Sequence, residues 1–179
     1  MSWRSRMSRV SALQAVAFTL AFAAAPAAVN AQGVVTTHKL SAALANQLVG
    51  DSVANCAQKN YKVVAVVVDL DGVRQALLRG DGAPIHSMDN AYYKAYSSAS
   101  ITLGRKEGST KEVADRMAKS AATTVPQTQL PNVTYGQGGL AIMSGGNIIG
   151  GLGVSGAPGG QFDEECARAA LGKIQDKLK

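Results

Sequence analysis

The sequence is poor in the side chains that most often build metal and catalytic centres. Its 179 residues include two histidines, two cysteines and one tryptophan. His38 and His86 occur without CxxC or HxxxH spacing, so a zinc site built on them would lack ligands. Ser155 lies in a stretch that lacks the full G-x-S-x-G spelling, and the chain lacks the parallel α/β pattern of a nucleophile-elbow hydrolase. No catalytic constellation is recognisable.

The N-terminal segment has the pattern of an export signal. Arg4, Arg6 and Arg9 precede an apolar run over residues 10–29, and the run ends in Val-Asn-Ala with small residues at the two positions that a signal peptidase reads. This pattern predicts a secretory signal over residues 1–31 and a periplasmic or secreted protein. The apolar run is long enough that a membrane anchor stays open as the alternative.

Signal removal changes the charge of the protein. The chain has a net charge of +6, from 18 basic and 12 acidic residues. Residues 1–31 contain three of the basic residues and none of the acidic ones, so residues 32–179 carry +3. Trp3 is lost with the signal, and no basic cluster with interleaved aromatic residues remains, which excludes a nucleic-acid surface. Residues 32–179 are long enough for a single domain with an ordinary core.

Cys56 and Cys166 are the two cysteines, so only one intramolecular disulfide is possible. In an oxidising compartment it would close a long loop and stabilise the fold by about 4–5 kcal/mol in the chain-entropy model. Two buried thiols that pack as small apolar side chains are the alternative.

The hydrophobic pattern predicts eight elements in the order α-β-β-α-α-β-β-α. Apolar residues recur every three or four positions in the first helix, and KVVAVVVD is apolar on both faces, as in a central strand. Hairpin-linked strands are antiparallel neighbours, so the fold class is α+β, an antiparallel sheet flanked by helices. Ser87 is predicted to cap the second helix. The expected elements cover residues 41–60, 62–69, 73–79, 88–103, 109–122, 139–144, 147–154 and 162–178.

Eleven of the nineteen glycines lie between Gly136 and Gly160, and Gly151-x-Gly153-x-x-Gly156 has the spelling of a dinucleotide fingerprint. That fingerprint needs a helix directly after the glycines and a further parallel strand, which this chain does not offer. Glycines within a strand instead allow another backbone, a side chain of a facing subunit or a flat ligand to approach closely.

Three ordered blocks resemble the GlcG/HbpS-like family of heme-degrading or heme-binding domain proteins: VVAVVVDLDGVRQALLRGDGAP, MDNAYYKAYSSAS and GGLAIMSGGNIIGGLGVSGAPGGQFDEECARAAL. The resemblance implies a profilin-like domain that assembles into homo-oligomers, and exported members include heme-binding sensors or stores. The heme-degrading activity in the family name is not carried over. The family's K-A-x-x-A pattern begins at Lys94 and departs from the pattern at Ser98.

Heme binding requires an axial donor, an apolar slot and basic groups for the propionates. Residues 84–105 offer His86 as the favoured iron ligand and Met88 as a second soft donor. Each of these residues has an alternative role without heme. Met88 and Tyr92 would then pack in the core, His86 would be a loop imidazole without a partner, and Lys94 would be exposed or ion-paired. The remaining candidates are three tyrosines as ligands or stacking walls and two cations for the propionates: Tyr92, Tyr93, Tyr96, Lys94 and Arg105.

A second hypothesis is an oligomeric accessory or sensor protein that binds a small organic acid without heme. Lys94, Arg105 and the backbone amides of Gly159, Gly160 and Gln161 would hold the carboxylate, because the first turn of a helix attracts anions. A plain connector between strand and helix is the alternative for this loop.

Overall fold

The computed structural model describes residues 33–119 and 130–179, and residues 36–179 form one compact unit. The expected signal over residues 1–31 lies outside the described residues, as does the expected end of the third helix at residue 122. Within the described ranges, no helix has the length and apolar character needed to cross a membrane.

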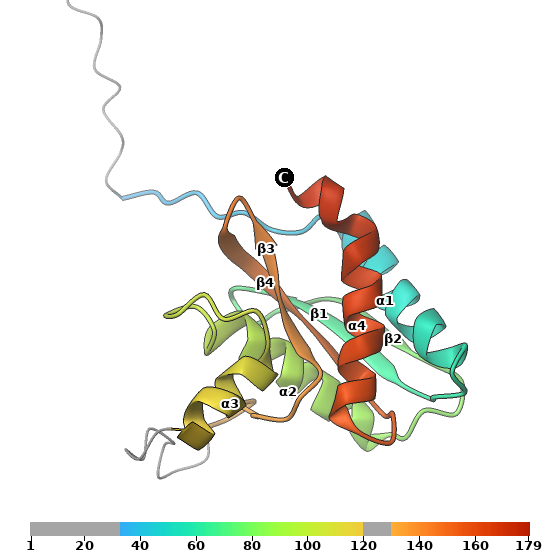
Figure 1. The fold of residues 1–179 in the computed structure, drawn as a ribbon. Helices are drawn as coiled ribbons and strands as arrows, with labels where there is room; N and C mark the ends of the chain where they lie inside the picture. The colour runs from blue at the N-terminus through green and yellow to red at the C-terminus, as the bar shows by residue number, and fades with distance from the viewer. Residues whose placement is uncertain (1–32, 120–129) are drawn as a thin grey trace, which may run out of the picture. The chain divides into compact units, whose positions relative to one another are not determined.

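The α+β fold class and the predicted element order are confirmed (Figure 1). Four strands form one antiparallel sheet in the order β2-β1-β4-β3. A short 3₁₀ turn over Gln175–Leu178 follows the last helix. The elements are α1 Ala42–Ala57, β1 Val64–Asp69, β2 Arg74–Arg79, α2 His86–Ser100, α3 Thr110–Lys119, β3 Gly139–Ser144, β4 Asn147–Ser155 and α4 Gly160–Ile174.

The central strand β1 is buried on both faces, as its sequence predicts. Successive side chains of a strand point to opposite faces of the sheet. Ala65 and Val67 therefore pack in the cluster that also contains residues of α1 and α4, whereas Val64, Val66 and Val68 pack against the alanines of α2. The helices α1 and α4 thus cover one face of the sheet, and α2 covers the other.

The first and last helices are linked covalently. Ser41 caps α1, with its Oγ accepting a hydrogen bond from the Leu44 N–H at 3.3 Å. Cys56 of α1 is bonded to Cys166 of α4, with their Cα atoms 5.4 Å apart. Both cysteines are buried, so the disulfide lies inside the core between the two helices.

The predicted helix cap at Ser87 is wrong. The helix α2 begins at His86, two residues before its predicted start, and Ser87 lies within its first turn, where its buried Oγ has no hydrogen-bond partner among the described residues. The chain already turns at Pro84 and Ile85, whose carbonyls accept hydrogen bonds from the N–H groups of Ser87 and Met88. The fixed φ of proline favours such an early start.

The backbone of α2 packs directly on the glycines of β4. A Cβ atom on Gly151 would overlap the carbonyl oxygen of Ala95, and one on Gly153 would overlap that of Ala91. The α2 backbone therefore lies directly against the strand, with no room for even a methyl group. The glycine pattern allowed another backbone, a side chain of a facing subunit or a flat ligand to approach this strand. In the structure it is the backbone of α2 that does so. Residues 157–179 form a helix and a 3₁₀ turn and contain no parallel strand, which contradicts a dinucleotide site at these glycines.

Replacing Gly153 with alanine should destabilise the fold. The new methyl group must push α2 away from the sheet, and overpacking of this kind lowers the free energy of unfolding by about 1–3 kcal/mol. Gly50 is the matched control, because a Cβ there meets no atom within 4 Å. Gly50→Ala should raise the free energy of unfolding by about 0.5–1 kcal/mol through helix propensity. Urea denaturation measures both changes, and equal effects would contradict the packing described here.

Candidate functional site

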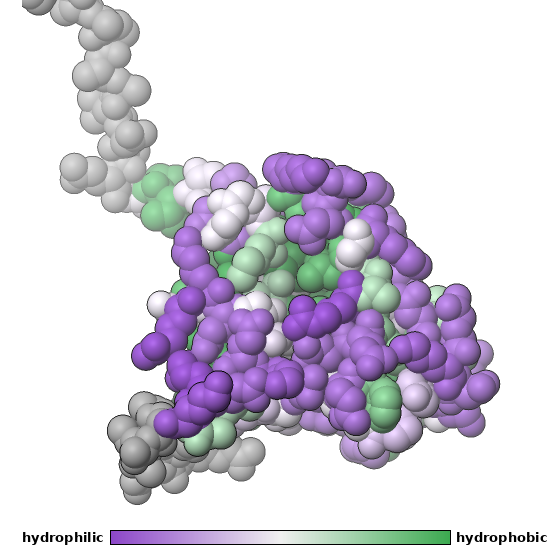
Figure 2. Space-filling model, in the orientation of Figure 1, coloured by the Kyte–Doolittle hydropathy of each residue, from purple (hydrophilic) through white to green (hydrophobic). Residues whose placement is uncertain are grey.

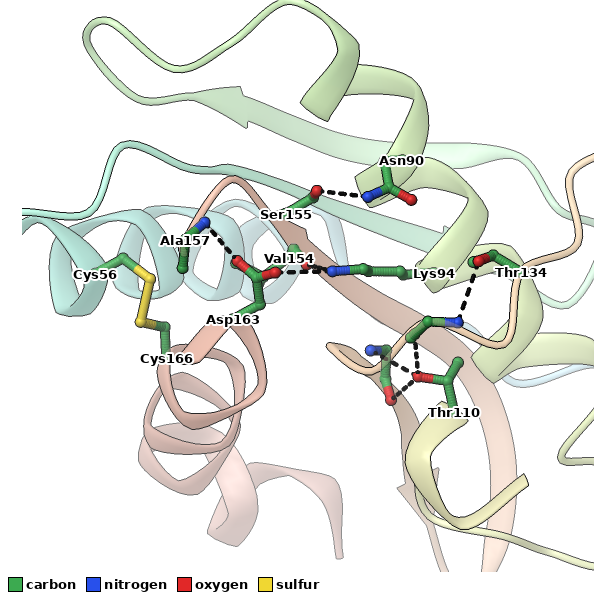
Figure 3. Close-up of polar contacts among 12 residues, drawn as sticks. Cys56, Asn90, Lys94, Thr110, Thr134, Val154, Ser155, Ala157, Asp163 and Cys166 are labelled. Atoms are coloured by element: carbon green, nitrogen blue, oxygen red, sulfur yellow. Dashed lines mark hydrogen bonds and ion pairs between the residues drawn. A yellow bond between two sulfur atoms is a disulfide. The ribbon is translucent and has the colours of Figure 1, made fainter. Parts of the chain in front are cut away.

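The buried face of α2 contains an ion pair. Lys94 is 4% exposed, and its Nζ donates hydrogen bonds to Asp163 Oδ2 at 2.8 Å and to the Val154 carbonyl at 3.0 Å. Figure 3 shows Lys94 reaching from α2 across β4 to the first turn of α4. Burial raises the pKa of Asp163 above its usual value, although the Lys94 ammonium and the Ala157 N–H act in the opposite direction. Three elements of the fold are tied together by this pair.

A glycine-rich loop, which includes residues 136–139, covers the ion pair. Gly138, at φ +119°, lies so close that a Cβ there would be 2.9 Å from Lys94 Nζ. Thr110 Oγ1 holds the loop by donating to the Gly136 carbonyl at 2.8 Å and accepting from the Gly139 N–H at 3.1 Å (Figure 3). The Thr134 N–H donates to Ser97 Oγ at 2.8 Å. Lys94 therefore points into the interior and is not available to a propionate or to a small organic acid, which matches the ion-paired alternative for this residue.

The other expected heme contacts do not form one site. His86 and Met88 are two residues apart on α2, so their side chains point about 200° apart around the helix axis. His86 is exposed, whereas Met88 and Tyr92 pack against the cluster beneath α2. Arg105 is exposed beyond the other end of α2, which is about 21 Å long from His86 to Ser100 at 1.5 Å per residue.

Tyr92 is the best-anchored aromatic residue of α2. Its hydroxyl donates to the Gly72 carbonyl at 3.1 Å, and the Arg74 guanidinium lies 3.6 Å from the centre of its ring. The rings of Tyr93 and Tyr96 each lie 6.0 Å from that of Tyr92. The side of α2 that carries Tyr92 therefore faces β2.

The predicted anion-binding loop lies at the start of α4. Gly159 is the N-cap residue, and Gly160 is packed against the Gln137 carbonyl. Asp163 lies in the first turn of this helix, where its Oδ1 accepts from the Ala157 N–H at 2.9 Å. The chain thus places its own carboxylate at this helix end, next to Lys94.

Two hollows near these elements differ in what they offer a ligand. Figure 2 shows an apolar hollow between the β3–β4 hairpin and α4; Leu140, Met143 and Leu171 help to line it, and its volume is 170 Å³. That volume is below the roughly 300–1,000 Å³ of most small-molecule sites. A second hollow of 450 Å³ lies beside Tyr96 and Ile101, but none of the described residues that line it is basic. Neither hollow combines an apolar wall of sufficient size with a cation for carboxylates.

A family model described as haem degrading protein HbpS-like matches residues 40–172. The chain belongs to the HbpS-like family. One HbpS crystal structure is similar at 27% identity and a TM-score of 0.70, over 83% of this chain and 99% of that one. A double mutant of Streptomyces reticuli HbpS shares 30% identity with a TM-score of 0.69, over 85% and 98%. No curated protein matches.

The HbpS-like fold also includes a structure solved with heme. The crystal structure described as the PduOC:Heme complex shares 29% identity with this chain, with a TM-score of 0.67. The match covers 76% of this chain and 96% of the other. Family membership and this neighbour support a heme-related function.

Variants of the buried ion pair should lose more stability than variants of a surface ion pair. Lys94→Met leaves a buried carboxylate and Asp163→Asn leaves a buried ammonium, so each should lower the free energy of unfolding by about 3–5 kcal/mol. The double variant Lys94→Met/Asp163→Asn should lose much less than the sum of the two single losses. The matched pair Lys111–Asp115, exposed by about half, should contribute only about 0.3–0.5 kcal/mol. Denaturation of the variants measures this, and additive losses at Lys94 and Asp163 would contradict direct coupling.

Proposed function

We propose that this chain is an exported heme-binding protein, a sensor or a store, in which heme binds against the N-terminal half of α2. Membership of the HbpS-like family and the heme-bound neighbour support the ligand. The observation that carries the location is the set of possible iron donors that α2 presents at exposed or partly buried positions: the His86 imidazole, the Met88 thioether and the Tyr92 phenol. The homo-oligomer implied by the family resemblance is part of this proposal.

The structure offers these donors on different sides of α2. His86, the iron ligand predicted from the sequence, is on the exposed side, whereas Met88 and Tyr92 are on the side that faces β2. A single heme cannot use both sides. Much of the binding energy of a flat apolar macrocycle comes from surface removed from water, which requires an apolar wall. The β2-facing side has such a wall, so we place the heme there, with Met88 as the first candidate donor.

The small-organic-acid hypothesis receives no comparable support. The side chains expected to hold the carboxylate are separated: Lys94 is buried against Asp163, and Arg105 is beyond the far end of α2. The structure therefore does not assemble the site that this second function requires.

Hemin titration tests the proposed function. The wild-type protein should develop a Soret band that saturates at one heme per chain, and Met88→Leu should shift or weaken the band because the thioether is lost while the side-chain volume is kept. His86→Ala should leave the band unchanged. A featureless wild-type titration would refute the proposed function, and loss of the band in His86→Ala alone would place the iron on the exposed side of α2.

N-terminal sequencing and thiol alkylation test the proposed export. The Cys56–Cys166 disulfide supports an oxidising compartment, because such bonds persist outside the cytosol. We expect protein recovered from the periplasm or the medium to begin at Gln32 on N-terminal sequencing, with no free thiol on alkylation. An intact N-terminus that begins at Met1 in a membrane fraction would instead indicate the anchor.

A further inference from the structure

The strand β2 has a face that α2 does not cover. Directly paired residues of neighbouring strands point to the same side of a sheet. Arg79, Leu77 and Arg74 pair with Val64, Val66 and Val68 of β1, and those three valines form the core beneath α2. The three β2 side chains therefore extend the same face past the edge of α2. Leu77 is 39% exposed, and both arginines are exposed.

The side of α2 that borders this strand is apolar. Ile85 already has helical backbone angles, so Ile85, Met88 and Tyr92, at positions i, i+3 and i+7, lie on one side of the helix. Ile85 is 75% exposed, and the contact between Arg74 and the Tyr92 ring shows that this side meets β2. We call this surface the β2 shelf; it consists of Arg74, Leu77, Arg79, Ile85, Met88 and Tyr92.

The shelf combines apolar area with positive charge. Arg74 and Arg79 flank Leu77 along the strand, and within residues 33–119 and 130–179 no salt bridge involves either arginine. Arg79 is held in place by donating from Nε and Nη2 to the Ala83 carbonyl at 2.9 and 2.5 Å, and Arg74 by stacking on Tyr92. Guanidinium groups that are already positioned bind carboxylates well, because their donors match the two oxygens.

We propose that the β2 shelf binds a porphyrin, with the macrocycle against Leu77, Ile85 and Met88 and the carboxylate side chains on Arg74 and Arg79. This inference rests on the proposed heme function and adds to it the residues that recognise the ring and its charges. A planar apolar ligand with carboxylates on its edge matches both properties of the shelf. A second copy of the chain would match the apolar part and would need acidic groups opposite the arginines.

Binding of metal-free protoporphyrin IX tests the shelf without any axial ligand. Porphyrin fluorescence should show at least tenfold weaker binding to Leu77→Asp, since the new charge is placed under the ring. The control Leu78→Asp changes a residue of equal exposure, 40%, on the opposite face of the same strand and should bind like the wild type. Thermal denaturation verifies that both variants are folded.

The dimethyl ester of protoporphyrin IX tests the arginines. Arg74→Gln and Arg79→Gln should each weaken binding of the free acid by about tenfold, roughly one charge-assisted contact, and leave the ester unaffected. Arg105→Gln, at the far end of α2, should change neither. Equal losses for acid and ester, or none, would refute the role of the arginines.

Two further outcomes separate this inference from the proposed function. Unchanged porphyrin and hemin binding in Leu77→Asp would refute the shelf while leaving heme binding intact, whereas absence of binding by the wild-type protein would refute both. If Leu77→Asp changes the mass of the assembly in solution without changing porphyrin affinity, the shelf is an interface between copies and the inference is wrong.

Discussion

The contact between the α2 backbone and the glycines of β4 determines what every other side of α2 can do. Because Gly151 and Gly153 leave no space for a methyl group, the inner side of the helix is fully used in packing. On the same side of the helix, Lys94 forms the buried ion pair with Asp163. Any ligand of α2 must therefore meet the exposed side or the side facing β2. The glycine run acts on ligand binding indirectly, by fixing which side chains of α2 remain accessible.

The element order and the central position of β1 could be predicted from the sequence, because both follow from local periodicity and from a run that is apolar on two faces. The glycine run could be assigned to close packing for a similar reason. Its partner could not, since the helix that approaches Gly153 is about sixty residues away along the chain. The start of α2 was displaced by the turn at Pro84, which overrode the capping preference of Ser87.

The candidate site was harder to predict than the fold. An ion-paired Lys94 was one of the alternatives, but its partner could not be identified from the sequence, because Asp163 lies 69 residues later. Arg74 was missed for a geometric reason: an irregularity in the register between Val67 and Val68 brings Arg74 onto the side of Leu77, whereas simple alternation places only Arg79 there.

The most direct test of the central claim is the change in the amide ¹H–¹⁵N spectrum when protoporphyrin IX is added. A porphyrin shifts nearby amide signals through its ring current, so the spectrum locates the ligand without a variant. The account predicts the largest shifts at Leu77, Ile85 and Met88, and small shifts at Gly151 and Gly153, which α2 shields. The largest shifts at the glycines of β4 would contradict it, because the ligand would then occupy the position that this structure gives to α2.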